Sequence, residues 1–104
     1  MNVEISGQNM HVNEEMKSHV ERQMEYALGQ FETWISSVKV HLEDVNGPRH
    51  GVDKQCRVLV SIKSGRTIKV EDADVEMAIA VNRAADRLGQ AVSREVDRRR
   101  EKKG

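Results

Sequence analysis

The chain has 104 residues and a formal net charge of zero, with 38% hydrophobic and 33% charged residues. This length fits one domain, and the balance of apolar and charged residues excludes a disordered chain. There is no apolar run of about 18 residues and no apolar leader, so we expect neither a membrane span nor a secretory signal. The single cysteine, Cys56, fits a reducing compartment, and we expect a cytoplasmic protein.

The charge is distributed unevenly along the chain. Residues 1–48 hold three basic and eight acidic side chains, whereas residues 49–104 hold fourteen basic and nine acidic ones. Eight of the basic residues lie in the stretch 82–104. This asymmetry predicts a polyanionic partner for the second half of the chain.

The first half predicts a strand, a helix and a strand. Residues 2–6 alternate polar and apolar, with Val3 and Ile5 on one side, as in a short strand, and residues 7–12 turn the chain. Asn13 is a suitable N-cap for an amphipathic helix from residue 14 to about 33. The segment SVKVHLE, residues 37–43, alternates again and predicts a second strand.

The second half predicts a hairpin and a long helix. A loop with two glycines and the only proline covers residues 45–53, and the strand CRVLVSIK follows over 56–63. The segment SGR is a tight connection to the strand TIKVE, residues 67–71. A final helix begins near Asp72 or Asp74 and runs towards residue 100, with an apolar stripe that includes Leu88.

The element order β-α-β-β-β-α predicts an α+β fold in a single domain over residues 1–104, with a frayed C-terminal end of the last helix. A right-handed crossover places the first helix on one face of a four-stranded sheet. Each strand has one apolar face, so both helices should cover that face and leave the other to solvent.

Three segments, in this order, resemble the ribosome hibernation-promoting family, also known as ribosome-associated translation inhibitors or sigma-factor modulation proteins. They are MNVEISGQNMHVNEEMKSHVERQME, KQCRVLVSI and EDADVEMAIAVNRAADRLGQAV. The resemblance covers nearly the whole chain through an ordered set of segments, and EDVNGPRHGVDKQC resembles short members of the family. The chain is similar to the short type, which lacks the C-terminal dimerisation domain of longer members.

The resemblance implies a fold related to double-stranded-RNA-binding domains. It also implies a stress factor that docks in the tRNA and mRNA channel of the small ribosomal subunit and inhibits translation without catalysis. The expected partner is the small subunit with its structured rRNA, and no membrane, small-molecule substrate or cofactor is expected.

Basic residues of the final helix form the candidate RNA-binding site. At 100° per residue, five polar side chains fall within an arc of about 80°, along a ridge of about 22 Å. They are Arg83, Arg87, Gln90, Arg94 and Arg98. Guanidinium groups offer two parallel donors to a phosphate, and the exposed sheet face adds Arg57, Lys63 and Lys69. The alternative interpretation is a solvated helix face whose basic C-terminal end is favoured by the helix dipole.

The type of nucleic acid is further constrained by the aromatic residues. Proteins that read single strands stack bases on exposed aromatic rings, and the predicted strands carry none. We therefore expect recognition of structured RNA through its shape and its phosphates.

Other candidate sites have simpler explanations. Cys56 lies on the inward side of its strand and is expected to be a core thiol. His41 and His50 lack metal-ligand spacing, so no metal site is expected. The acidic run Glu71 to Asp74 fits helix capping and the helix dipole. No nucleophile, base and oxyanion donor come together, and we expect no enzyme activity.

A second hypothesis is a protein–protein interaction module on the same fold, with no RNA binding. It is supported by the first helix, whose exposed side carries five glutamates and only two basic residues. The glutamates are Glu14, Glu15, Glu21, Glu25 and Glu32, and the basic residues are Lys17 and Arg22. Such a face repels a phosphate backbone. A small-ligand or metal carrier is a third possibility, for which the sequence offers no positive feature.

Overall fold

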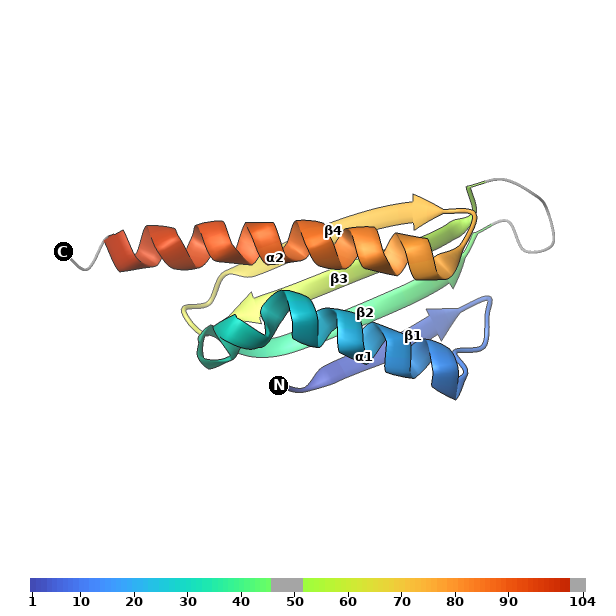
Figure 1. The fold of residues 1–104 in the computed structure, drawn as a ribbon, viewed down its shortest axis with the longest axis horizontal. Helices are drawn as coiled ribbons and strands as arrows, with labels where there is room; N and C mark the ends of the chain where they lie inside the picture. Colours follow the sequence, from blue (N-terminus) through green and yellow to red (C-terminus); the bar gives the residue numbers. More distant parts are fainter. Residues whose placement is uncertain (46–51, 102–104) are drawn as a thin grey trace.

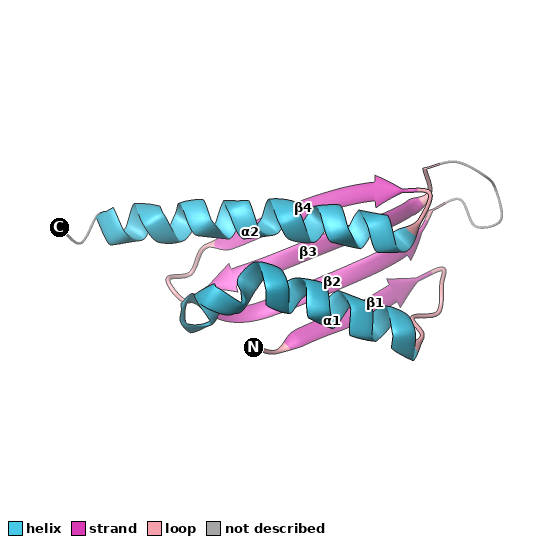
Figure 2. Ribbon diagram, in the orientation of Figure 1, coloured by secondary structure: helices cyan, strands magenta, loops and turns pink. Residues whose placement is uncertain are grey.

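The computed structural model describes residues 1–45 and 52–101. The predicted element order is confirmed, with one additional short helix of the 3-10 type (Figure 2). The elements are β1 (Val3–Gln8), α1 (Glu14–Leu28), η1 (Gly29–Trp34), β2 (Ile35–Asp44), β3 (Lys54–Ile62), β4 (Thr67–Asp74) and α2 (Met77–Glu101). Most of the predicted loop 45–53, including His50, lies outside the described residues.

The four strands form one sheet in the order β1-β2-β3-β4. β1 is parallel to β2, and the other two pairs are antiparallel. Both helices lie on the same face of the sheet, with α2 near β3 and β4 and α1 beside α2 (Figure 1). The predicted α+β fold is therefore confirmed, and no helix of the described residues covers the opposite face of the sheet.

The core lies between the sheet and the helices, because alternate strand residues and one stripe of each helix are apolar. Val38, Val40 and Leu42 of β2 are buried there, together with Leu28 of α1. The prediction that Cys56 is a core thiol is confirmed: it is fully buried, and burial raises the pKa of its thiol to about 12.

Two element boundaries differ from the predictions. The final helix begins at Met77, not near Asp72 or Asp74, because β4 continues in register with β3 as far as Asp74 opposite Lys54. The first helix ends at Leu28 and continues as a tighter 3-10 segment. This change of helical geometry accompanies the burial of Phe31 and precedes the first residue of β2.

The predicted hairpin connection between β3 and β4 is confirmed. Gly65 has a φ of 102°, a left-handed conformation that favours glycine. The turn is closed by hydrogen bonds from the Ile62 amide to the Arg66 carbonyl at 2.7 Å and from the Gly65 amide to the Ile62 carbonyl at 2.8 Å. The tight turn therefore fixes the position of Arg66, directly before the first residue of β4.

The second helix runs well past the ends of the strands (Figure 1). Near its end, the Arg100 guanidinium lies 5.9 Å from the centroid of the Trp34 ring, and this cation–π contact joins the helix to η1. The fraying of its last residues stays a prediction, and residues 102–104 lie outside the described part. Within the described ranges, no helix is long and apolar enough to cross a membrane.

Candidate nucleic-acid interface

The four predicted arginines of α2 are all exposed, as expected from their place on the helix. The structure separates the seven predicted RNA-binding residues into groups. Arg83 and Arg87 lie along β4, Arg57 lies on the uncovered face of the sheet, and Lys63 lies at the hairpin. Lys69 lies with Arg57 on the uncovered face, where both pair with Glu71, and Arg94 and Arg98 line one hollow between β4 and α2.

Arg83 is tied to the end of β4. Its Nη2 donates to the carbonyl oxygen of Ala73 at 2.7 Å and to Oδ1 of Asp74 at 3.0 Å. Its Nε lies 3.3 Å from Oδ1 of Asp72. Three of the donor directions of this guanidinium therefore point at the protein, which leaves fewer for a phosphate.

Arg87 repeats this arrangement one helical turn later. Its Nη1 donates to the carbonyl oxygen of Glu71 at 2.6 Å and lies 3.4 Å from Oδ2 of Asp72. Asp72 thus accepts from two arginines spaced four residues apart on α2. The two arginines join the second helix to the last strand.

The acidic run before α2 has a wider role than the predicted capping. Oδ2 of Asp74 does accept from the backbone amide of Glu76 at 2.9 Å, at the approach to the helix. However, Asp72 and Asp74 lie in β4, and their carboxylates also bind Arg83. The prediction was incomplete because the partners are distant in sequence and meet only when α2 folds back along β4.

Acid should weaken this junction. The hydrogen bond from the Glu76 amide, followed by the charge of Arg83, lowers the pKa of Asp74. Because the pKa of Asp74 is lower in the folded state than in the unfolded state, its ionised carboxylate stabilises the fold when the pH is above the ordinary carboxyl pKa. This stabilisation is lost as the pH falls through the pKa of the folded state. We expect Asp74→Asn to lower the free energy of unfolding at about pH 6 and to match the wild type at about pH 2. Urea unfolding of both proteins across this pH range measures the difference in their free energies of unfolding. A difference that stays the same at every pH would contradict the prediction.

The hollow between β4 and α2, which we call the β4–α2 cup, has a volume of about 310 Å³. It is lined by Arg66, Thr67, Ile68, Lys69, Ala91, Arg94, Glu95 and Arg98. Three of the side chains that face it, Arg66, Arg94 and Arg98, are cationic and one, Glu95, is acidic, since the Lys69 side chain points to the uncovered face of the sheet. The Nζ of Lys69 also lies 3.0 Å from Oε1 of Glu71, whereas Arg94 makes no ion pair within the described ranges.

Glu95 and Arg66 are absent from the predicted set. Glu95 is only 4% exposed, although it is a charged residue of α2, whose other charged residues are mostly exposed. A signal was present in the sequence, because Glu95 follows Leu88 by seven residues and Ala91 by four and so continues the apolar stripe. A charged residue at such a position needs a partner, which the sequence alone does not identify.

The uncovered face of the sheet is polar and of mixed charge. His41 contacts the Ser6 hydroxyl through Nδ1 at 3.0 Å and Gln8 Oε1 through Nε2 at 3.1 Å. Arg57, in the next strand, lies 3.7 Å from Glu71, and its Nε is buried without a hydrogen-bond partner in the described structure. Among the described residues, no group of three histidine, cysteine or acidic side chains could hold a metal ion.

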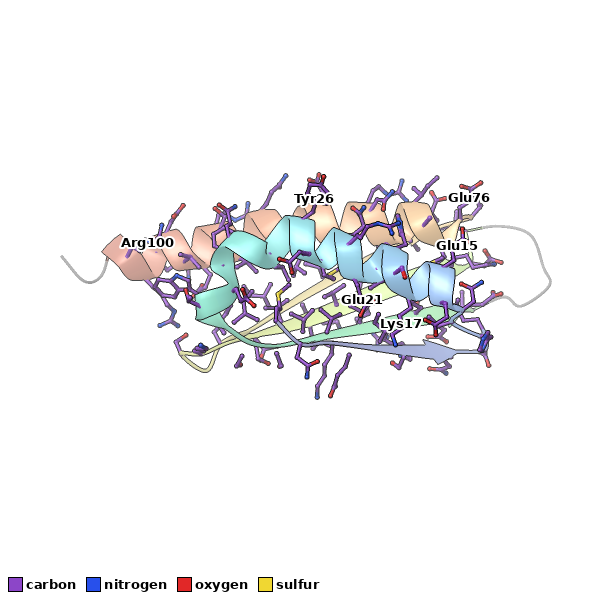
Figure 3. All side chains as sticks on the ribbon, turned by 60° about the horizontal axis from the view of Figure 1, so that its bottom comes forward. Glu15, Lys17, Glu21, Tyr26, Glu76 and Arg100 are labelled. Carbon is purple, nitrogen blue, oxygen red and sulfur yellow. The ribbon has the colours of Figure 1, made fainter. Side chains whose placement is uncertain are left out.

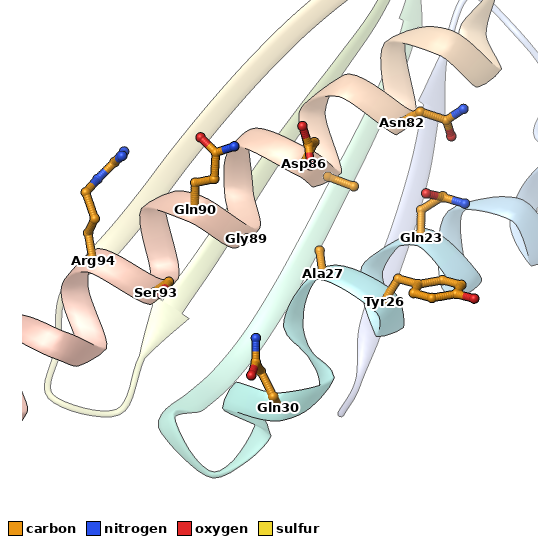
Figure 4. A pocket seen from close by; sticks show the side chains of 11 residues that line it. Gln23, Tyr26, Ala27, Gln30, Asn82, Asp86, Gly89, Gln90, Ser93 and Arg94 are labelled. Carbon is orange, nitrogen blue, oxygen red and sulfur yellow. The ribbon is translucent and has the colours of Figure 1, made fainter.

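A second and larger hollow, of about 830 Å³, runs between the two helices on the side away from the sheet (Figure 4). Gly89 lets the helices approach closely, since a Cβ at this position would lie 3.2 Å from the Ala27 carbonyl oxygen. Tyr26 stands at its edge with 87% of its surface exposed. Its polar lining is mainly amide side chains, from Gln23, Gln30, Asn82 and Gln90.

The first helix keeps the acidic surface expected from its sequence. Glu15 and Glu21 are exposed on α1, and Lys17 lies between them in sequence (Figure 3). These residues lie towards the end of the molecule where Glu76 begins the approach to α2, whereas Arg100 lies at the opposite end (Figure 3). Basic side chains therefore concentrate along the second half of α2.

The comparisons with known proteins give a family and a fold. The family model described as sigma 54 modulation protein / S30EA ribosomal protein matches residues 3–100. No curated protein sequence matches the chain.

Two solved structures share the fold. The N-terminal domain of Protein Y from Thermus thermophilus has a TM-score of 0.73 at 22% identity, covering 90% of this chain and 98% of that one. A ribosomal subunit interface protein from Coxiella burnetii has a TM-score of 0.78 at 15% identity, covering 93% of this chain and 99% of that one. At these identities the likeness establishes the architecture.

Proposed function

Because the chain belongs to the sigma 54 modulation protein / S30EA ribosomal protein family, we propose that it is a cytoplasmic stress factor that binds the small ribosomal subunit. It would inhibit translation by occupying the path of tRNA and mRNA, with no catalytic step. The family match over residues 3–100 carries this proposal. The shared fold with a protein described as a ribosomal subunit interface protein supports it.

The proposed contact surface is the basic side of α2 with the adjoining strands. Arg83, Arg87, Arg94, Arg98, Arg57, Lys63 and Lys69 would face rRNA phosphates. Arg94 and Lys63 would contribute most readily, since their side chains make no ion pair within the described structure that binding would have to break. Arg83 and Arg87 would contribute through the donors that β4 leaves free.

A contact surface of this kind suits structured RNA. The described strands present no phenylalanine, tyrosine or tryptophan on the uncovered face, and the one imidazole ring there, of His41, is already bonded to Ser6 and Gln8. The domain measures 53 × 23 × 20 Å along its principal axes. An elongated body held by phosphates would act by excluding other ligands from the space it fills.

Salt dependence of ribosome binding tests the proposal. We expect the purified protein to co-sediment with isolated small subunits in about 50 mM salt, and to lose most of this binding by about 200 mM, because each phosphate contact releases counterions. Bound fractions across the series give the slope of affinity against salt. Absence of binding at the lowest salt, with an intact fold by circular dichroism, would rule the proposal out.

The second candidate function is a protein–protein interaction module, favoured by the hollow between the helices. Exposed Tyr26 beside a groove of amide side chains is a feature of protein contact surfaces, and the neighbouring acidic residues of α1 disfavour RNA there. Binding to a protein partner through this groove would depend little on salt. Tyr26→Ala should then abolish partner binding, whereas ribosome binding through α2 should be unaffected.

A further inference from the structure

We propose that the β4–α2 cup holds one phosphodiester group of the bound RNA, and that the buried carboxylate of Glu95 positions Arg66 and Arg98 for this contact. The inference rests on the proposed function for the identity of the RNA. It adds two residues to the predicted surface and gives an acidic residue a role in binding an anion.

The position of Glu95 is the first observation. With 4% of its surface exposed, its carboxylate is removed from water and requires cationic partners. Oε1 lies 3.4 Å from Nε of Arg66 and 3.5 Å from Nη1 of Arg98, and Oε2 accepts from Nε of Arg99 at 2.9 Å. One carboxylate therefore holds arginines from the hairpin and from α2.

The donors left over are the second observation. Arg66 and Arg98 each approach Glu95 through one nitrogen, and both side chains remain 53% exposed. A guanidinium has five N–H donors in a fixed plane, so fixing one edge also orients the others. The two arginines share Oε1 as an anchor, and their remaining donors are therefore held near the same opening.

The charge balance of the cup is the third observation. The side chains that face it include Arg66, Arg94 and Arg98 against Glu95 alone, whereas Lys69 points to the other face of the sheet and pairs with Glu71. The third arginine on Glu95, Arg99, further offsets the carboxylate from outside the lining. An excess of oriented cations around a hollow of about 310 Å³ suits an oxyanion with its bridging water.

Removal of the Glu95 carboxylate tests the proposal, because net charge and positioning of the arginines predict opposite changes in affinity. Glu95→Gln makes the protein more positive, so charge alone predicts equal or tighter binding to small subunits. If Glu95 positions the arginines, the same variant should bind about tenfold more weakly. Asp97→Asn is the matched control, because it makes the same charge change at an exposed position two residues away and should bind at least as tightly as the wild type.

Arg66→Gln keeps the test decisive if Glu95→Gln does not fold. Arg66 lies on the exposed hairpin, where a glutamine is readily accommodated, and its loss should also weaken binding about tenfold. Undiminished affinity of Arg66→Gln, or of folded Glu95→Gln, would overturn the proposal.

A titration with inorganic phosphate separates this inference from the proposed function. In the wild type, phosphate should shift the Nε–H resonances of Arg66 and Arg98 in nitrogen-15 spectra, and in Glu95→Gln the shifts should be much smaller. Such a result supports the cup even if the protein fails to sediment with ribosomes, in which case only the proposed function fails. Unshifted arginine resonances in the wild type would overturn the cup as a phosphate site.

Discussion

Replacement of Arg94 and Arg98 together by glutamine should lower the affinity for small ribosomal subunits by about 100-fold. A hydrogen bond to a charged group contributes about 1.5 kcal/mol or more, and two such losses correspond to about two factors of ten. Both side chains are exposed and line the β4–α2 cup. Arg94 makes no ion pair in the described structure, whereas Arg98 is one of three arginines that pair with the buried Glu95, so we expect a modest fall in the melting temperature and a variant that is still folded at room temperature.

The matched control for this variant is the replacement of Lys17 and Arg22 by glutamine. It removes the same two positive charges from exposed positions, but on α1. We expect the control to bind within about threefold of the wild type at the same salt concentration, since exposed charges far from the contact are screened. The salt slope should also fall by about two in the α2 variant alone. Equal losses in both variants would mean that net charge, and not the cup, determines binding.

Leu88→Ala should destabilise the fold by about 3 kcal/mol. Leu88 is fully buried and belongs to the single core that joins α2 to the sheet and to α1. Truncation removes buried methyl groups and leaves a cavity that the two helices cannot close by a small movement. For a domain of this size, the melting temperature should fall by about 15 °C.

Gln90→Ala, on the exposed side of the same helix, is the control for this prediction. It makes a truncation of similar length at a solvent-exposed position, and the free energy of unfolding should change by no more than about 0.5 kcal/mol. Urea unfolding of both variants gives the comparison. A loss below about 1 kcal/mol in Leu88→Ala would show that the helix packs loosely on the sheet.

The sheet and its inward residues could be predicted from sequence because alternation is a local property. Val38, Val40 and Leu42 recur every second residue, and all three are buried. The two helices were recognisable for the same reason, through a period of three to four residues. Their common face followed from each strand having one apolar side.

The start of α2 and the partners of its arginines could not be predicted in this way. An acidic run before an apolar stripe is the usual sign of a helix N-terminus, and pairing with β3 overrode it as far as Asp74. Arg83 and Arg87 meet Asp72 across the gap between strand and helix, which no spacing along the chain specifies.

The β4–α2 cup shows a further limit of sequence interpretation. Arg66 and Glu95 are separated by the whole of β4 and most of α2, and the hairpin geometry around Gly65 brings them together. The position of Glu95 on the apolar stripe is a signal that the sequence contains, although the predicted set of site residues did not include it. Its partners and the convergence of their donors required the fold.

The bonds of Arg83 and Arg87 to the carbonyl oxygens of Ala73 and Glu71 have a consequence for self-association. β4 is an edge of the sheet, and these two carbonyls are acceptors that an added strand from another molecule would use. Since side chains of the same chain already occupy them, the edge is a poor template for intermolecular β-pairing. The contacts that join α2 to the sheet thus also oppose aggregation at high protein concentration.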